Sequence, residues 1–231
     1  MVPDSLQVSP ENASNGHVDQ SKFEVLLSRI AHDQKALLRH ISIYAELSKD
    51  RDITQDARNQ NLNKISGKVT ALARLADCER LISMIERKAF ERRDISLSKV
   101  INTQLRQSPH YREHGNWTLS GEASAKVDPQ FLSFALREIF LNAAQHAQPD
   151  QPLEITLLDQ PSATIRITTN AATKVEDRLF EPFETAQPND KESTGSGLGL
   201  YAVRQIMTKH HGQATLESPA PGTFSVVLTF P

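Results

Sequence analysis

The sequence is short of the features that mark secreted, membrane and disulfide-rich proteins. Its 231 residues include one cysteine, Cys78, which excludes a disulfide framework and a cysteine metal cluster. No apolar run approaches the roughly 20 residues that span a bilayer, and no basic stretch precedes an apolar core near the start. The net charge of −2 indicates no general affinity for nucleic acid. We therefore expect a cytoplasmic protein without a membrane span.

Glycine is also scarce, and its distribution is uneven. The chain has 9 glycines, none between Gly121 and Gly195, and then three fall close together at Gly195, Gly197 and Gly199. An apolar, helix-forming run follows from Leu200. A glycine-rich turn that opens a helix lets backbone N–H groups approach an anion at the positive end of the helix dipole. This clustering favours a phosphate cradle over the alternative, a flexible surface loop.

The N-terminal half is predicted to be helical. Residues 1–20 are polar and aperiodic, which predicts a disordered tail, with a binding peptide as the alternative. Residues 21–49 carry apolar side chains at three- and four-residue steps and predict a helix. His32 lies roughly 160° around this helix from Ile30, so its ring should face solvent beside Asp33. An exposed histidine on a helix is usually just a solvated residue.

A polar turn at 50–59 should lead into a second helix that runs to about Glu91. Asp52 and Gln55 have the spacing of a capping box for it. Each helix has one narrow, heptad-like apolar stripe, and a lone hairpin cannot bury both stripes. A dimer that forms a four-helix bundle is the economical solution, and packing of the stripes on the C-terminal domain is the alternative. Cys78 lies in the second stripe and should be a small core residue.

The rest of the chain is predicted to be a separate α/β domain. Residues 92–95 read as a linker before a capped helix start at Ser96, so we place the boundary at 92–93. Polar residues 184–194 predict a mobile lid. Strands are expected at 117–120, 125–127, 153–158, 163–169, 214–217 and 224–230, and helices at 129–146 and from the glycine cluster to about His211.

The helix at 129–146 has a capping signal and a polar line. Asp128 should be its N-cap, before a proline at the first helical position. Glu138, Asn142 and His146 stand one turn apart along its surface. An Asn amide and a carboxylate at this spacing can hold a hydrated Mg²⁺ and its phosphates. The alternative is three ordinary polar residues on a wet face.

Several blocks of the sequence resemble, in order, the catalytic core of two-component sensor histidine kinases. The resemblance covers residues 22–230. The blocks are IAHDQKALLR at 30–39 (H-box), DISL at 94–97 (entry to the ATPase domain), REIFLNAAQH at 137–146 (N-box), LFEPF at 179–183 (F-box) and GSGLGL at 195–200 (G2 box).

The resemblance implies an α+β fold. Residues 21–92 would be a dimerising helical hairpin that forms a four-helix bundle and carries the phosphoacceptor. Residues 93–231 would be a two-layer α/β sandwich that binds ATP. The implied partners are a second copy of the chain and the receiver domain of a response regulator. A signal would arrive through an upstream sensor protein or through the N-terminal tail. The receiver domain would bind the helix face around His32, Lys35, Ala36 and Arg39.

The resemblance also implies residue roles. His32 would accept the γ-phosphate of ATP, and Asp33 would orient or deprotonate its imidazole. Asn142 would ligate Mg²⁺ with support from Glu138, and His146 would approach the phosphates. The G2 residues Gly195, Gly197, Leu198 and Gly199 would cradle those phosphates.

Two departures from the family pattern stand out. The family's G1 box, Asp-x-Gly-x-Gly, is replaced by ITTNAAT at 167–173, so Asn170 or Thr169 would have to accept the adenine amino hydrogen bond. A neutral acceptor lowers affinity by roughly tenfold. In the H-box, Ala36 stands where Thr or Asn often supports phosphatase activity, which predicts that this activity is weakened.

Three functions are compatible with the sequence. The first is an ATP-dependent histidine kinase that passes a phosphoryl group from His32 to a response-regulator aspartate. The second is a non-enzymatic phosphotransfer or scaffold protein with a vestigial nucleotide site, which the missing G1 box favours. The third is an ATPase of the anti-sigma-factor kinase or chaperone type, against which the phosphoacceptor-like hairpin argues.

Overall fold

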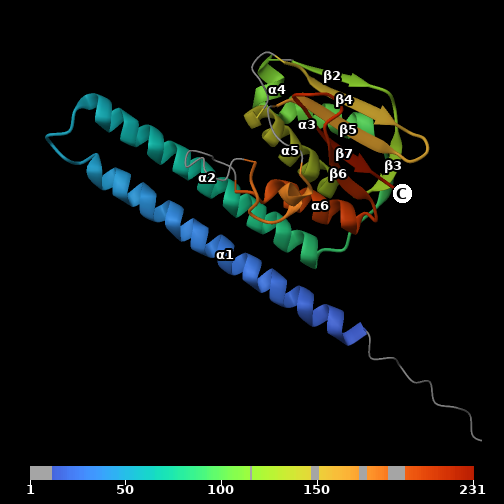
Figure 1. Cartoon of the computed structure of the whole chain (residues 1–231), viewed down its shortest axis with the longest axis horizontal. Helices are drawn as coiled ribbons and strands as arrows, with labels where there is room; N and C mark the ends of the chain where they lie inside the picture. The colour runs from blue at the N-terminus through green and yellow to red at the C-terminus, as the bar shows by residue number, and fades with distance from the viewer. Residues whose placement is uncertain (1–11, 115, 147–150, 172–175, 187–195) are drawn as a thin grey trace, which may run out of the picture. The chain divides into compact units, whose positions relative to one another are not determined.

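The computed structural model describes residues 12–114, 116–146, 151–171, 176–186 and 196–231 (Figure 1). Two compact units, residues 1–75 and 76–231, make up the chain. The division falls inside a helix rather than at the predicted boundary of 92–93. The end of that helix belongs with the C-terminal unit because its side chains bind there. Arg137 Nη2 pairs with Asp77 Oδ2 at 3.1 Å, and Lys88 Nζ donates to Gln130 Oε1 at 2.7 Å.

The N-terminal unit is a helical hairpin. Its helices are α1 (Asn12–Leu47) and the first part of α2 (Gln55–Arg87). Because α1 begins at Asn12, the predicted tail is helical from that residue on, and residues 1–11 lie outside the described residues. Extending a helix that has already formed adds a hydrogen bond per residue, so polar residues can join it. The cap of α2 is Thr54, whose Oγ1 accepts the Ala57 N–H at 3.2 Å, rather than Asp52.

The hairpin leaves several large apolar side chains exposed. Those on α1 and α2 expose between 48% and 67% of their surface: Val25, Leu38, Ile43, Leu47, Leu62 and Val69. Exposed apolar surface of this extent is typical of an interaction face. It is what a dimeric four-helix bundle would bury, and that bundle stays a prediction.

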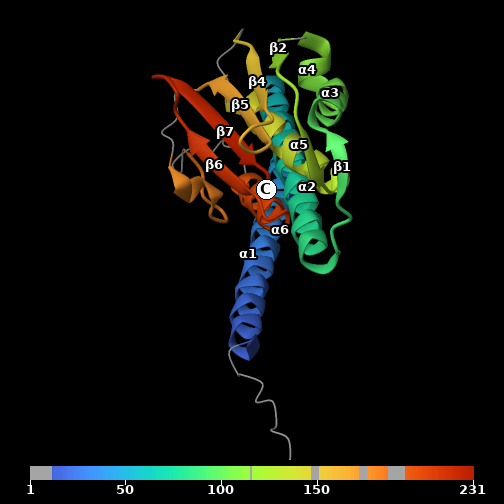
Figure 2. The ribbon, with the colours of Figure 1, turned by 90° about the vertical axis from the view of Figure 1, so that its right-hand side faces the viewer.

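The C-terminal unit is a two-layer α/β structure, which confirms the predicted α+β fold. A five-stranded mixed sheet has the strand order β2–β4–β5–β7–β6. Figures 1 and 2 show α3, α5 and α6 on one of its faces. The bounds are α3 Leu97–Gln107, α4 Pro109–His114, α5 Pro129–His146, η1 Asp177–Phe180 and α6 Gly199–Lys209; β2 Trp117–Ser120, β4 Leu153–Leu158, β5 Thr164–Asn170, β6 Gln213–Glu217 and β7 Thr223–Thr229.

A second, smaller sheet joins a segment that the sequence analysis assigned to a linker. Strand β1 (Arg93–Ser96) pairs antiparallel with β3 (Ser124–Val127), so that Arg93 lies opposite Val127. The linker prediction is therefore wrong for these residues. Their strand character is hidden in the sequence because Ile95 is the one apolar residue of β1, too few for a visible alternation.

The core lies between the large sheet and its helices. In β5 the buried positions alternate with partly exposed ones, and Ile165 and Ile167 face the core opposite Leu228 and Val226 of β7. The predicted core residues of α5 are all buried: Leu132, Leu136, Ile139, Phe140 and Ala143. This packing fixes α5 on the sheet and with it the polar line that α5 carries.

Asp128 joins three elements at the start of α5. Its Oδ1 accepts the backbone N–H groups of Gln130 at 2.9 Å and Phe131 at 3.3 Å, which confirms the predicted N-cap. Its Oδ2 accepts the Glu91 N–H at 2.9 Å, and its own N–H donates to His210 Nε2 at 2.9 Å. The segment after α2 and the end of α6 are thereby held against α5.

Candidate functional site

The glycine cluster opens α6 as predicted. Gly199 is the first residue of the helix and the buried Leu198 is its N-cap, with its N–H donating to Ser196 Oγ at 3.3 Å. Gly197 has φ +66°, a left-handed conformation that L side chains rarely adopt. The N–H groups of the first turn of α6 have no partner within the helix, so this end of α6 suits an anion. Gly195 lies outside the described residues.

The polar line of α5 meets the start of α6. A methyl group placed on Gly199 would lie 3.0 Å from Glu138 Oε2 and 3.7 Å from Asn142 Nδ2. Glycine at this position therefore lets the two helices approach at the point where two of the predicted binding residues stand. His146, the third residue of the line, ends α5 and is exposed.

The F-box turn, defined here as residues 179–184, packs on the backbone of Gly197. The Phe183 N–H donates to Gly197 O at 2.9 Å. A Cβ atom on Gly197 would lie 2.5 Å from the Phe183 carbonyl carbon, closer than real side chains come. Two blocks singled out separately in the sequence are thus in backbone contact.

The two predicted acceptors for an adenine lie on opposite faces of β5. Thr169 continues the buried positions Ile165 and Ile167 and is 7% exposed on the side of the helices. Asn170, the next residue, points to the other face, and its Nδ2 donates to Gln151 Oε1 at 3.1 Å. The strand register therefore favours Thr169 over Asn170. The end of the stretch that replaces the G1 box, from residue 172, lies outside the described residues, as does most of the predicted lid.

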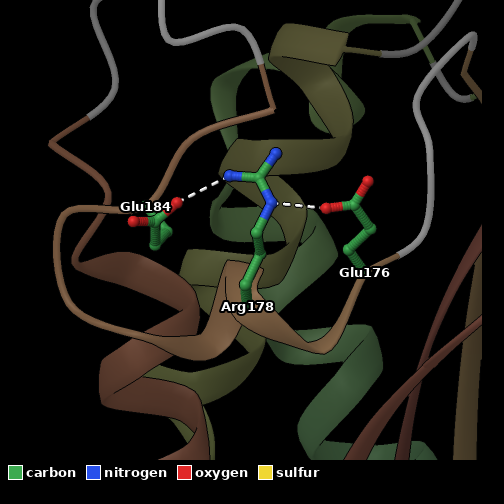
Figure 3. A network of polar contacts seen from close by, with 3 residues as sticks. All are labelled: Glu176, Arg178 and Glu184. Carbon is green, nitrogen blue, oxygen red and sulfur yellow. Dashed lines mark hydrogen bonds and ion pairs between the residues drawn. The ribbon is translucent and has the colours of Figure 1, made fainter.

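Sequence analysis missed two arginines that bind the F-box turn. Arg178 lies between Glu176, to which its Nε donates, and Glu184, whose Oε2 lies 2.6 Å from its Nη1 (Figure 3). Arg204, from α6, pairs with Glu181. The carboxylates raise the pKa of Arg178 further above its usual range. Arg178 directly precedes the LFEPF block, which is a local signal, whereas nothing in the sequence marks Arg204.

Cys78 is a packed side chain rather than a nucleophile. It is 3% exposed, and Ser196 Oγ approaches its Sγ at 4.0 Å. Burial, with the nearby Glu138 charge, raises the pKa of its thiol to about 12. Since the thiolate is the reactive form, Cys78 is inert at neutral pH, which agrees with its predicted core position.

A second candidate site, within the N-terminal unit, is His32 on α1. Its side chain is 75% exposed, as the helical periodicity predicted, and its Nδ1 lies 3.2 Å from Asp33 Oδ1. A carboxylate accepts hydrogen bonds but cannot donate them, so Asp33 favours the tautomer with the proton on Nδ1. The lone pair of a neutral imidazole is then on Nε2, where an electrophile can reach it.

The oxygen donors on α5 suit Mg²⁺. Carboxylate and amide oxygens, such as those of Glu138 and Asn142, are hard ligands, and Mg²⁺ takes one or two from protein and the rest from water and phosphate. In the part of the chain that the structure describes, no group of three or more His, Cys, Asp or Glu side chains could hold a metal ion. The residues present fit an ion shared with a nucleotide rather than one held in a protein cage.

Known proteins resemble this chain over part or most of its length. Residues 127–231 match the family described as histidine kinase-, DNA gyrase B-, and HSP90-like ATPase. The sensor protein VanSC of Enterococcus gallinarum is 27% identical over 213 residues, which cover 84% of this chain and 56% of that protein. The sensor protein CzcS of Cupriavidus metallidurans is 25% identical over 236 residues, which cover 96% of this chain and 48% of that protein. The chain therefore spans about half the length of these relatives.

Solved structures share the fold. The Acinetobacter baumannii histidine kinase AdeS superposes with a TM-score of 0.64 at 14% identity, covering 86% of this chain and 96% of that one. Full-length ShkA in complex with AMPPNP gives a TM-score of 0.57 at 16% identity, covering 90% of this chain and 45% of that one.

In the part of the chain that is described here, no helix is long and apolar enough to cross a membrane. Residues 127–231 match a histidine kinase-like ATPase domain, and most of the chain is similar to the catalytic core of sensor histidine kinases.

Proposed function

We propose that this chain is a histidine kinase that phosphorylates His32 from Mg-ATP and passes the phosphoryl group to an aspartate of a response-regulator receiver domain. The observation that carries the proposal is the meeting of Glu138, Asn142 and Gly199 at the start of α6. The exposed His32–Asp33 pair supports it. In this proposal, residues 21–92 serve as the dimerisation and phosphoacceptor hairpin and residues 93–231 as the ATP-binding domain.

The start of α6 would bind the phosphates. Backbone N–H groups at a helix N-terminus point at an anion, and the helix dipole favours its charge. Gly197 and Gly199 allow the backbone to approach without side chains in the way, next to Leu198. Gly195 and His146 would also contact the phosphates. Asn142, supported by Glu138, would hold the Mg²⁺, which neutralises phosphate charge when bound.

Thr169 would contact the base. Its side chain lies on the helix face of β5, where a hydroxyl can accept a hydrogen bond from an exocyclic amino group. A hydroxyl carries no charge, so this bond is weaker than one to a carboxylate. We therefore expect the site to bind ATP less tightly than a site with aspartate at this position.

In the proposed chemical step, His32 is the nucleophile. Its Nε2 lone pair attacks the γ-phosphorus, the bond from that phosphorus to the β,γ-bridging oxygen breaks, and ADP leaves with the electron pair. The ring then carries a positive charge, which Asp33 stabilises through the Nδ1 proton. Transfer to a receiver aspartate breaks the N–P bond and restores the neutral ring.

The proposed binding surface for the receiver domain lies on α1, the helix that carries His32. Lys35, Ala36 and Arg39 follow His32 on α1, and a receiver domain would bind there. A second copy of the chain would cover the exposed apolar side chains of the hairpin.

The experiment is incubation of the purified chain with γ-labelled ATP and Mg²⁺. We expect acid-labile label on the parent and none on His32→Gln, while His40→Gln, a second exposed histidine of α1, keeps it. An unlabelled but folded parent would refute autophosphorylation. If the chain took up label only from a receiver domain that carries labelled phosphate, and not from ATP, it would instead be a phosphotransfer protein that does not use ATP.

A further inference from the structure

The F-box turn has a backbone conformation that needs support. Phe183 has φ +69°, a left-handed conformation that is unfavourable for a bulky side chain. The turn begins within the 3₁₀ helix η1, and residues 181–186 form no helix or strand. Contacts from outside the segment therefore add to those within it, such as the hydrogen bond from the Glu184 N–H to Glu181 O at 3.3 Å.

Arg204 supplies two such contacts from the second turn of α6. Its guanidinium carbon lies 4.5 Å from the centroid of the fully buried Phe180 ring, within the range of a cation–π interaction. Its Nη1 donates to Glu181 Oε1 at 3.2 Å. The planar guanidinium can lie over a ring and pair with a carboxylate at once, which joins the turn to α6 at two adjacent residues.

The turn held by Arg204 is the one that contacts Gly197. Phe183 follows Glu181 by two residues and donates its N–H to Gly197 O. Gly197 precedes Gly199, whose position against Glu138 and Asn142 defines the candidate nucleotide site. One helix thus carries the proposed phosphate site at its first residue and, one turn later, the side chain that fixes the turn packed against that site.

Arg178 binds the same segment in a different way. It joins Glu176 to Glu184 within residues 176–184, so it stiffens the turn locally and gives no link to α6 (Figure 3). Its side chain is 44% exposed, and exposed pairs contribute little stability. Among the residues that the structure describes, Arg204 rather than Arg178 therefore joins the F-box turn to α6.

We propose that Arg204 is a positioning residue for nucleotide phosphates: by stacking on Phe180 and pairing with Glu181, it holds the F-box turn against Gly197 and so fixes the backbone at the start of α6. This inference rests on the proposed function, because it concerns the same nucleotide site. Arg204 itself touches neither the phosphates nor His32 in this role.

The test compares Arg204→Met and Arg204→Lys with Arg166→Met in the full chain. Arg166 is a matched control because it pairs with Glu217 in the same unit at a similar exposure of 37%. We expect Arg204→Met to raise the Kd and the KM for Mg-ATP about tenfold with little change in kcat. The lysine variant, which keeps the charge but not the planar guanidinium, should recover only part of the loss. Arg166→Met should bind as the parent does.

A second readout does not need the nucleotide. The Phe183 N–H is bonded to Gly197 O, so its hydrogen exchange by NMR should become faster in Arg204→Met and stay unchanged in Arg166→Met. Unchanged exchange, or equal weakening of Mg-ATP binding by both methionine variants, would overturn the inference. A parent that binds no Mg-ATP would refute the proposed function itself, and the exchange rate would still decide whether Arg204 holds the turn.

Discussion

At the scale of single residues, Gly197 combines a left-handed backbone with a close contact to a neighbouring segment. Its φ of +66° and its contact with the Phe183 backbone leave no room for a side chain. We predict that Gly197→Ala weakens Mg-ATP binding by more than about tenfold and lowers the unfolding free energy by about 1–3 kcal/mol, as measured by calorimetry and urea denaturation.

Gly222 is the matched control for Gly197. It also has a positive φ, +77°, but a Cβ there would meet nothing within 4 Å. Gly222→Ala should therefore carry the backbone strain alone, with unchanged nucleotide affinity. Equal losses of affinity in the two alanine variants would contradict a local role for Gly197.

His210 gives the C-terminal unit a pH dependence. The ring is buried between two hydrogen bonds: Nδ1 donates to Ile206 O at 2.8 Å, and Nε2 accepts the Asp128 N–H. Burial is the main cause that lowers the pKa of His210, and the Arg92 charge acts in the same direction. A histidine that stays neutral when folded binds its proton more readily unfolded, so the stability it contributes is present above the unfolded pKa of about 6.5 and is lost as the pH falls below it.

The pH prediction is tested by the unfolding free energy between pH 7.5 and 5.5. We expect the parent to lose stability toward pH 5.5 and His210→Gln to lose less over the same interval, because glutamine does not titrate. His211→Gln, which changes the exposed neighbour, should follow the parent. Parallel curves for the parent and His210→Gln would show that another group causes the loss.

At the scale of helices and strands, the segments that could be predicted correctly are those in which the spacing of apolar residues reflects which side chains are buried. The core face of α5 and the Asp128 cap were visible because apolar periodicity and capping chemistry are local. Strand β1 was not visible, because its pairing with β3 is decided by a segment about 30 residues away, and three of its four residues are polar.

The candidate site shows the same division. The glycine cluster and the line from Glu138 to His146 could be read from spacing, and so could the exposure of His32. The roles of Arg204 and the choice of Thr169 over Asn170 depend on tertiary contact and strand register. A shift of one residue in the register of a strand moves each side chain to the opposite face of the sheet. The sequence alone does not determine the register of β5, so it cannot decide between Thr169 and Asn170.

The helices α1 and α2 lead to a prediction about assembly. Leu38 and Val69 are 51% and 48% exposed. If a second hairpin covers them, the double variant Leu38→Gln/Val69→Gln should raise the dimer dissociation constant at least about tenfold by sedimentation, because two buried apolar side chains are lost from each protomer. Leu158→Gln, at 47% exposure on β4, should leave the dimer intact. A parent that sediments as a monomer would contradict the four-helix bundle.

At the scale of the whole molecule, the chain carries two candidate functional parts in separate units. The hairpin unit presents an exposed histidine with its tautomer set by Asp33. The ATPase-type unit presents a glycine-opened helix beside an amide and a carboxylate. Either part alone would be an ordinary surface feature. A histidine kinase needs both a histidine that accepts phosphate and a site that binds ATP.

The measurement that tests the central claim most directly is a calorimetric titration of the purified chain with Mg-ATP. We predict binding in the micromolar range, about tenfold tighter binding in Thr169→Asp because a carboxylate adds charge to the hydrogen bond, and weaker binding in Asn142→Ala. A folded parent that takes up no Mg-ATP, with no recovery in Thr169→Asp, would contradict the claim that the start of α6 is a nucleotide site.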